Sequence, residues 1–228
     1  MRAIISFSLF GNTPKYLVGA IENTKLSKVI YPGWDCRFYV DDLVPKEVIY
    51  DLQCLGANII EMPRSDGFTG CFWRFIVADD IKYDYWIVRD VDSRLSYRER
   101  RAVDEWLISG YPFHLMHDHP CHIKPIMGCA IGGVCGAIEK MEEKVNSWKK
   151  KNAYCDDEEF LARIIYPLIK DKAIDHNSFA SRYDERVRKF PTPFEAYRFV
   201  GERVLENEIP EQKEMEILIS ALKTMDSK

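Results

Sequence analysis

Hydrophobic positions follow strand-like and helix-like spacing in alternation through the first hundred residues. Short apolar runs bounded by Gly, Pro, Asn or Asp predict strands at 3–10, 36–40, 58–62 and 85–88. The segments between them carry apolar residues three and four positions apart, which predicts helices after Pro14, after Pro45 and over 70–81. This alternation is typical of an α/β fold with a mostly parallel central sheet flanked by helices.

The second half of the chain is less regular. The pattern predicts strands at 113–117 and 126–133 and helices over 136–151 and 156–170. A capping box, Ser96 with Glu99, starts another helix, and the last twenty or so residues form a charged amphipathic helix. We therefore predict a single domain over residues 1–201 and a C-terminal helical extension over residues 202–228 that packs on it.

Composition narrows the classes of function. The chain has 228 residues, 46% hydrophobic and 30% charged, which suits one ordinary globular domain. The formal net charge of −4 argues against general nucleic-acid binding, and no run approaches the ~18 apolar residues of a membrane span. The N-terminus reads as a strand, not as a signal peptide, and seven scattered cysteines are typical of reduced thiols. We expect a cytoplasmic protein.

Two acids, Asp90 and Asp92, follow directly on the apolar run Tyr85–Val88. Residues two apart in a strand share one face, so their like charges would repel unless a cation lay between them. A hard divalent cation is the obvious candidate, because such ions prefer carboxylate oxygens. The alternative is a solvated turn.

Other predicted strands also end in polar residues. The first ends at 8–11 and the second at Asp41. Ligands of open parallel sheets collect at these carboxyl ends. The chemistry that suits carboxylates there is transfer from a nucleoside diphosphate, in which a metal ion neutralises charge on the departing phosphate.

Several segments, in this order, resemble one family. They are "FWRF" (72–75), "RDVDSRLS" (89–96), "AVDEWL" (102–107), "FHLMHDHPCH" (113–122), "IMGCAIGG" (126–133), "DDEEFLARIIYP" (156–167) and "DHNSF" (175–179). Their combination is similar to glycosyltransferases of the GT-A fold. It is most similar to small enzymes with a DxD motif from large algal viruses and bacterial polysaccharide clusters. The resemblance spans about residues 3 to 201.

The resemblance implies a GT-A, Rossmann-like domain and a hexosyltransferase activity. It implies a nucleotide-sugar donor carried by uridine diphosphate, a Mn²⁺ or Mg²⁺ cofactor, and a glycan or small acceptor with a hydroxyl group. For a virus-encoded enzyme, the compartment would be the host cytoplasm.

The resemblance also assigns site residues. The metal ligands are Asp90, Asp92 and His176. Donor-binding positions are Phe7, Ser8, Leu9, Phe10, Gly11, Asp41, Arg74, Asp90, Ser93 and Arg94. For the acid that serves the acceptor we favour Asp157, with Asp156 and Asp118 as alternatives.

Some of these residues have structural alternatives. Arg74 could snorkel from a buried aromatic helix, and the acids at 156–158 could simply favour a helix N-terminus. His114, His117, His119 and His122, with Cys121, could make a zinc site, but strand alternation puts His114 on the opposite face from His117 and His119. A polar pocket wall, or histidines satisfied within the fold, are the other interpretations.

Two other functions fit parts of this sequence. Phosphatases of the haloacid-dehalogenase type place D-x-D after a strand, with the first Asp as nucleophile and the second as general acid. Their motif ordinarily ends the first strand, whereas three predicted strands precede it here, and Arg94 stands where a small or apolar residue is expected. A non-catalytic nucleotide-sugar binding protein is the second alternative.

Overall fold

A mixed sheet of eight strands forms the centre of the computed structural model, which describes residues 1–226. The strands are β1 (Ala3–Leu9), β2 (Trp34–Val40), β3 (Asn58–Glu61), β4 (Tyr85–Val88), β5 (Phe113–His117), β6 (Ile131–Val134), β7 (Ala173–Asn177) and β8 (Val187–Arg188). Their order is β3-β2-β1-β4-β6-β5-β7-β8, and β6 alone runs antiparallel to its neighbours among the described strands. The predicted fold class, a mostly parallel sheet with flanking helices and a helical C-terminus, is confirmed.

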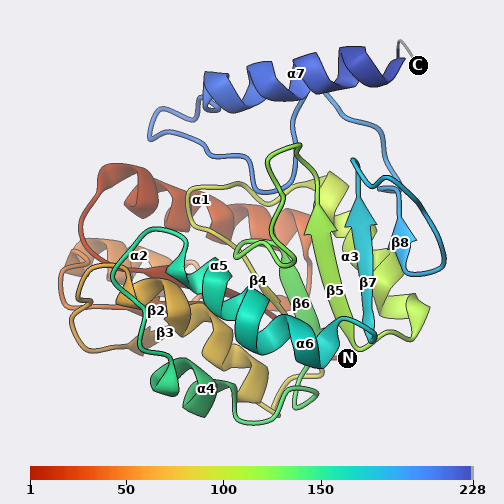
Figure 1. Ribbon diagram of the computed structural model, residues 1–228. Coiled ribbons are helices and arrows are strands. Elements are labelled where there is room, and N and C mark those ends of the chain that lie inside the picture. Colours follow the sequence, from red (N-terminus) through yellow and green to blue (C-terminus); the bar gives the residue numbers. More distant parts are fainter. Residues whose placement is uncertain (227–228) are drawn as a thin grey trace.

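Helices cover both faces of this sheet (Figure 1). They are α1 (Pro14–Ile30), α2 (Lys46–Cys54), the 3₁₀ helix η1 (Thr69–Asp79), α3 (Tyr97–Ser109), α4 (Met141–Ser147), α5 (Asp156–Phe160), the π-helical turn η2 (Leu161–Ile165), α6 (Tyr166–Ile169) and α7 (Gln212–Asp226). Successive residues of a strand point to opposite faces, so Ile5 and Phe7 pack with α1, α2 and α3, whereas Ile4 packs with η1, α4 and the α5–α6 segment.

The order of the strands reverses at β1. The chain passes from β1 to β2 and β3 on one side, and then returns to place β4 on the other side of β1. At such a reversal of strand order, the connections after the two central strands diverge and leave a crevice outside their carboxyl ends. The crevice beyond β1 and β4 is therefore where the topology places a ligand.

Some elements differ from the sequence-based expectation. The helix expected over 136–151 is reduced to α4, because Gly136 and Lys140 both adopt left-handed conformations ahead of it. The strand expected over 126–133 begins only at Ile131. Within it Gly132 and Gly133 are required by space, since a Cβ on Gly133 would lie 2.7 Å from the Trp86 ring. β7 and β8 were not predicted, because β7 has only two apolar residues, Ala173 and Ile174, followed by three polar ones, of which His176 is buried.

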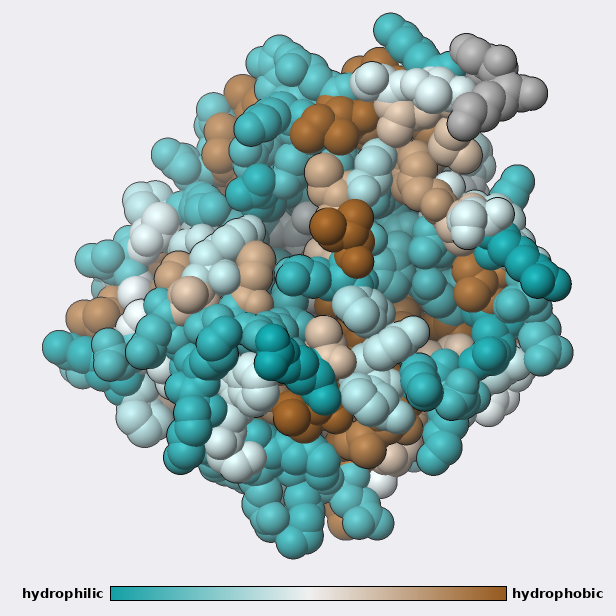
Figure 2. Space-filling view, in the orientation of Figure 1, coloured by the Kyte–Doolittle hydropathy of each residue, from teal (hydrophilic) through white to brown (hydrophobic). Residues whose placement is uncertain are grey.

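The C-terminal segment lies beyond the carboxyl ends of β5 and β7, where Figure 1 shows α7 crossing the top of the molecule. The Val204 amide donates to the Asp92 carbonyl at 2.7 Å, and Leu218 of α7 is fully buried. The face of the molecule in Figure 2 is largely hydrophilic, with hydrophobic residues in small separate groups. In residues 1–226, no helix combines the length and the apolar character needed to cross a membrane.

Candidate functional site

A pocket of about 230 Å³ opens at the crevice between β1 and β4. We call it the acidic pocket, because four carboxylates line it. Its lining residues are Ser8, Phe10, Tyr16, Phe68, Cys71, Arg74, Asp90, Val91, Asp92, Gly128, Tyr154, Cys155, Asp157, Glu158 and Arg203. The predicted acid pair therefore lies in a pocket at the position that the strand order indicates.

Asp90 and Asp92 both line the pocket, but the predicted shared strand face is wrong. β4 ends at Val88, so the two acids belong to a loop and do not share a strand face. Asp90 forms an ion pair with Arg74, while Asp92 pairs with Lys15 at 2.9 Å. The like charges are thus compensated by two separate cations from other elements.

Arg74 is the central cation of the acidic pocket. Its buried guanidinium contacts Asp90 through Nη1 and Asp157 through Nη2, the latter at 2.7 Å. The interpretation that Arg74 merely snorkels to the surface is therefore wrong. η1 is fixed beneath it by β1, since Ser6 Oγ donates to the Arg74 carbonyl and the Arg74 amide donates to Ser8 Oγ at 3.0 Å.

Helix α1 fixes residues 90–95, which we call the acidic loop, in a way that the sequence did not reveal. Asn23 Nδ2 donates to the Ser93 carbonyl at 2.8 Å, and its Oδ1 accepts from the Leu95 amide at 3.0 Å. Gly19 lies against the same loop, and a Cβ there would stand 1.9 Å from the Val91 carbonyl oxygen. Because α1 approaches so closely, the conformation of residues 90–95 is set from outside the loop.

The start of α5 contributes two acids to the pocket, Asp157 and Glu158. Burial, and then the charge of Asp157, raise the pKa of Glu158 above its ordinary value. Gly128 packs on Arg74 and Asp157, and a Cβ there would lie 2.9 Å from Arg74 Nη2 and 3.0 Å from Asp157 Oδ2. The absence of a side chain at Gly128 therefore permits the Arg74–Asp157 contact.

Four aromatic side chains line the same pocket: Phe10, Tyr16, Phe68 and Tyr154. The Phe10 ring contacts the edge of Trp73, with centroids 6.0 Å apart, and it covers Gly70 so closely that a Cβ would fall 2.3 Å from the ring. Flat rings beside cations and carboxylates can bind a planar base next to phosphate groups. Of these four, only Phe10 was predicted as a site residue.

Several predicted nucleoside contacts prove to be structural. Phe7 stacks on Phe38 at 4.8 Å in the core, and Leu9 is buried in the same cluster. Asp41 is buried and accepts from the amides of Gly11, Leu43 and Ser65, at 3.0, 3.2 and 3.3 Å. Both Asp41 oxygens are thereby used to hold three loops together. Phe7, Leu9, Gly11 and Asp41, which were expected to bind the donor, therefore do not line the acidic pocket.

Ser93 and Arg94 do not line the acidic pocket either. Ser93 Oγ donates to the Asp90 carbonyl at 3.0 Å and closes the turn. Arg94 pairs with Glu208 at 2.7 Å and donates to the Val91 carbonyl. Ser93 and Arg94 therefore stabilise the acidic loop on the side away from the pocket. The sequence-based expectation had placed them beside the sugar.

Two of the three candidate catalytic acids are occupied by structural contacts. Asp118 has no exposed surface and accepts from Arg98, Ser178 and the Val200 amide. Asp156 Oδ2 accepts from the amides of Asn152 and Ala153 at 3.0 and 2.9 Å, which caps the preceding turn. Neither Asp118 nor Asp156 lines the pocket, so Asp157 is the candidate that the structure retains.

The predicted trio of metal ligands is not assembled. His176 is buried in β7, and its ring nitrogens face His114 Nε2 at 2.8 Å and Glu105 at 2.9 Å. Among residues 1–226, no group of three His, Cys, Asp or Glu side chains is gathered for one ion. The same observation contradicts the alternative of a zinc site among the histidines. Asp90 and Asp92 nonetheless present hard oxygen donors to one pocket, which fits a divalent cation of the Mg²⁺ or Mn²⁺ type.

The histidine segment 114–122 is satisfied within the fold. His117 Nδ1 pairs with Asp175 at 2.7 Å, and its Nε2 faces the Lys124 carbonyl. His119 bonds the Glu214 carbonyl and stacks on Phe199 at 4.4 Å. These contacts favour the structural interpretation of the histidines over a pocket wall.

Comparison with known proteins gives similarity at the level of solved structures. No protein-family model matches the chain, and no curated protein matches it significantly. Glucosyl-3-phosphoglycerate synthase from Mycobacterium tuberculosis, solved with uridine diphosphate, is 12% identical over 81% of this chain and 73% of that chain, with a TM-score of 0.49. An active-site mutant of LgtC is 16% identical over 87% of this chain and 90% of that chain, with a TM-score of 0.48.

A further structure of the Mycobacterium tuberculosis synthase contains Mn²⁺, uridine diphosphate and phosphoglyceric acid. It is 10% identical, with a TM-score of 0.42, and the match covers 60% of this chain and only 56% of that chain.

Proposed function

We propose that the protein is a metal-dependent glycosyltransferase. In this proposal the acidic pocket binds a nucleoside diphosphate sugar and the protein transfers the sugar to a hydroxyl of a glycan or small acceptor. One observation carries the proposal: Asp90, Asp92, Asp157 and Glu158 converge with Arg74 at the carboxyl ends of β1 and β4. Such a set can hold a cation, a diphosphate and an acceptor hydroxyl within one small volume.

Asp90 and Asp92 are the residues that would hold a Mn²⁺ or Mg²⁺ ion. Once bound, the ion would supply positive charge where the leaving diphosphate becomes negative. Arg74 and Lys15 pair with these acids, and Arg203 lies with Arg74 in the pocket wall. They would contact phosphate oxygens, and the aromatic rings around Phe10 would hold the base. Uridine diphosphate as the carrier follows from the resemblance in sequence.

Glu158 and Asp157 would serve the acceptor side. Asp157 holds Arg74 through Nη2, whereas Glu158 combines a place in the pocket wall with a raised pKa. A carboxylate whose pKa lies closer to neutrality is a better proton acceptor for an attacking hydroxyl. We therefore assign proton transfer to Glu158, which the sequence did not select, and orientation of Arg74 to Asp157. A cytoplasmic location remains part of the proposal.

The test is product analysis with a panel of nucleotide sugars and Mn²⁺. Release of nucleoside diphosphate together with a glycosylated acceptor would support the proposal. Release of inorganic phosphate would indicate a phosphatase, and binding without any product would indicate a non-catalytic binding protein; either outcome would overturn the proposal. Asp92→Asn should be inactive, while Asp104→Asn, a matched change at an acid on α3 paired with Arg100, should stay active.

A further inference from the structure

A second, larger cavity lies on the other side of the wall that bounds the acidic pocket. It has a volume of about 720 Å³ and lies between α1, α3 and the segment 192–208. We call it the arginine groove. Its lining is Leu26, Ile30, Arg94, Leu95, Ser96, Tyr97, Arg98, Arg101, Thr192, Pro193, Glu195, Arg198, Phe199, Glu202, Val204 and Glu208. This volume falls within the range of small-ligand sites.

The groove and the acidic pocket share a wall without sharing residues. Along the extended segment 202–204, Glu202 and Val204 line the groove, whereas Arg203 lines the acidic pocket. The loop after β4 divides in the same way, with Asp90 and Asp92 on one side and Arg94 on the other. The proposed transferase chemistry therefore uses none of the groups in the groove.

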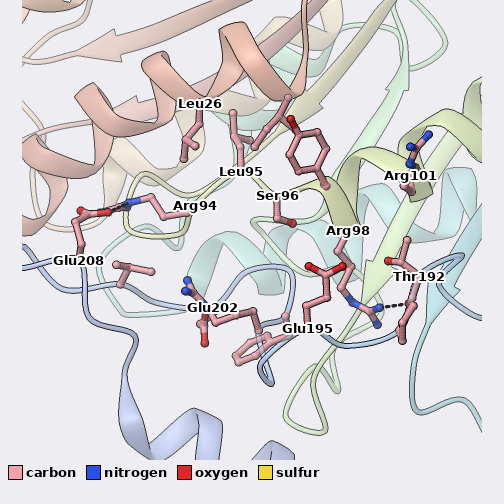
Figure 3. Close-up of a pocket in the computed structure, with 16 residues that line it drawn as sticks. Leu26, Arg94, Leu95, Ser96, Arg98, Arg101, Thr192, Glu195, Glu202 and Glu208 are labelled. Carbon is pink, nitrogen blue, oxygen red and sulfur yellow. Dashed lines mark hydrogen bonds and ion pairs between the residues drawn. The ribbon is translucent and has the colours of Figure 1, made fainter.

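Most of the charge in the groove is already neutralised. Arg94 pairs with Glu208, Arg198 pairs with Glu202, and Arg98 pairs with the buried Asp118 while lying over the Phe194 ring at 4.0 Å. Figure 3 shows Arg94 with Glu208 at one end of the groove, Arg98 with Thr192 at the other, and Glu202 between them. Such a lining holds both donors and acceptors while offering little net charge to attract an ion.

Two buried oxygen atoms in this lining have no partner. In the part of the chain that the structure describes, Glu202 Oε1 and Thr192 Oγ1 are the only buried side-chain oxygens without a hydrogen bond, and both belong to the groove. Glu202 is only 3% exposed. A buried acceptor left without a donor costs about 1–3 kcal/mol, so a ligand that donates to both atoms would gain this energy.

We propose that the arginine groove is a second binding site, which takes a neutral saccharide. Vicinal hydroxyls both donate and accept, so they can donate to Glu202, Thr192 and Glu195 while accepting from the neighbouring guanidinium groups. Tyr97, which is exposed, supplies flat apolar surface for a sugar ring. The paired charges leave little net charge to attract an ammonium group or an inorganic anion, and an anion would also leave the two oxygens unpaired. This inference does not rest on the proposed transferase activity.

The test is calorimetric titration with maltotriose, cellotriose and chitotriose, without nucleotide or metal, with spermidine and inorganic phosphate as the charged probes. Thr192→Val keeps the shape but removes the hydroxyl, and Glu195→Gln neutralises an exposed carboxylate of the lining. Each change should weaken binding of a trisaccharide by about 5-fold or more. Glu185→Gln, a matched change outside the groove, should leave that binding unchanged.

Three outcomes would overturn the proposal. One is that none of the trisaccharides binds the wild-type protein. Another is that spermidine or phosphate binds more tightly than any trisaccharide, which would mark the groove as an ion site. The last is that trisaccharide binding persists unchanged in both Thr192→Val and Glu195→Gln, which would place the saccharide elsewhere.

Discussion

Individual contacts decide which acids of this chain are free to act on a ligand. Asp41, Asp118 and Asp156 each follow the pattern of a functional acid in the sequence, yet backbone amides or Arg98 occupy their oxygens. Asp90 and Asp157 meet at one guanidinium, that of Arg74. A carboxylate whose oxygens are already bonded stabilises loops, whereas one that faces a pocket can exchange its partner for a ligand.

Gly19 sets the position of the acidic loop. Alanine normally stabilises a helix relative to glycine by about 1 kcal/mol. At Gly19 the added Cβ would stand 1.9 Å from the Val91 carbonyl oxygen, so α1 or the loop must move. We expect Gly19→Ala to weaken binding of uridine diphosphate with Mn²⁺ by ~10-fold or more, a loss of at least about 1.4 kcal/mol. Calorimetry would measure it. Lys28→Ala on the exposed face of α1 should have wild-type affinity, and the same affinity in Gly19→Ala would contradict this account.

The raised pKa of Glu158 predicts the pH dependence of transfer. Burial and Asp157 raise that pKa, so Glu158 becomes protonated at a higher pH than an ordinary glutamate, whose pKa is 4.5. A protonated carboxyl cannot accept the proton of the acceptor, so kcat/KM should fall as pH decreases through the raised value. Glu158→Gln should slow transfer by ~100-fold or more and remove this limb from the pH profile. A limb that persists in Glu158→Gln would assign it to another group, with Asp157→Asn as the next variant.

Elements with regular patterns could be predicted from the sequence, and elements fixed by distant contacts could not. β1, β2 and β4 are apolar runs, and α3 begins with Ser96 accepting from the Glu99 amide as the capping box implies. β7 escaped prediction because His176 is buried by bonding His114, a residue 62 positions away. The acid pair, Arg74 and Asp157 were predicted as site residues, and all four line the acidic pocket. Lys15, Asn23, Glu158 and Arg203 were missed, because their roles follow from helices and segments that only the fold brings to β4.

The buried histidines of β5 and the loop after it predict sensitivity to acid. Burial, then His176 and Arg89, lower the pKa of His114 well below 6.5, and burial with His117 and His119 lowers that of His122 to about 3. As pH falls, these histidines therefore become protonated in the unfolded chain at a higher pH than in the folded protein. The contribution of these two histidines to the free energy of unfolding should be fully present above pH 6.5. It should be lost as pH falls below that value, by up to about 1.4 kcal/mol per pH unit for each group.

His122→Asn tests this at one position. Asparagine can still accept from the Asp118 amide, which donates to His122 Nδ1 at 3.1 Å, but it does not titrate. Denaturant unfolding at neutral and at mildly acidic pH should show that the variant loses less stability than the wild type as pH falls. Equal losses in the two proteins would indicate that His122 has an ordinary pKa.

At the scale of the whole molecule, three segments that are distant in the sequence meet in one wall. The loop after β4, the helix α1 and the segment 202–204 meet there, through Asn23 and through the bond from the Val204 amide to the Asp92 carbonyl. The acidic pocket lies on one side of this wall and the arginine groove on the other. The segment beyond residue 201, expected as an appendage, therefore supplies Arg203 to the pocket.

The central claim is that Asp90 and Asp92 recruit a divalent cation that binds a nucleoside diphosphate in the acidic pocket. The most direct measurement is calorimetric titration of uridine diphosphate into the wild type, Asp92→Asn and Asp104→Asn, each with and without Mn²⁺. An amide cannot replace an anionic ligand, so the account predicts Mn²⁺-dependent binding in the wild type and in Asp104→Asn, and its loss in Asp92→Asn. Wild-type affinity without metal, or in Asp92→Asn, would contradict it.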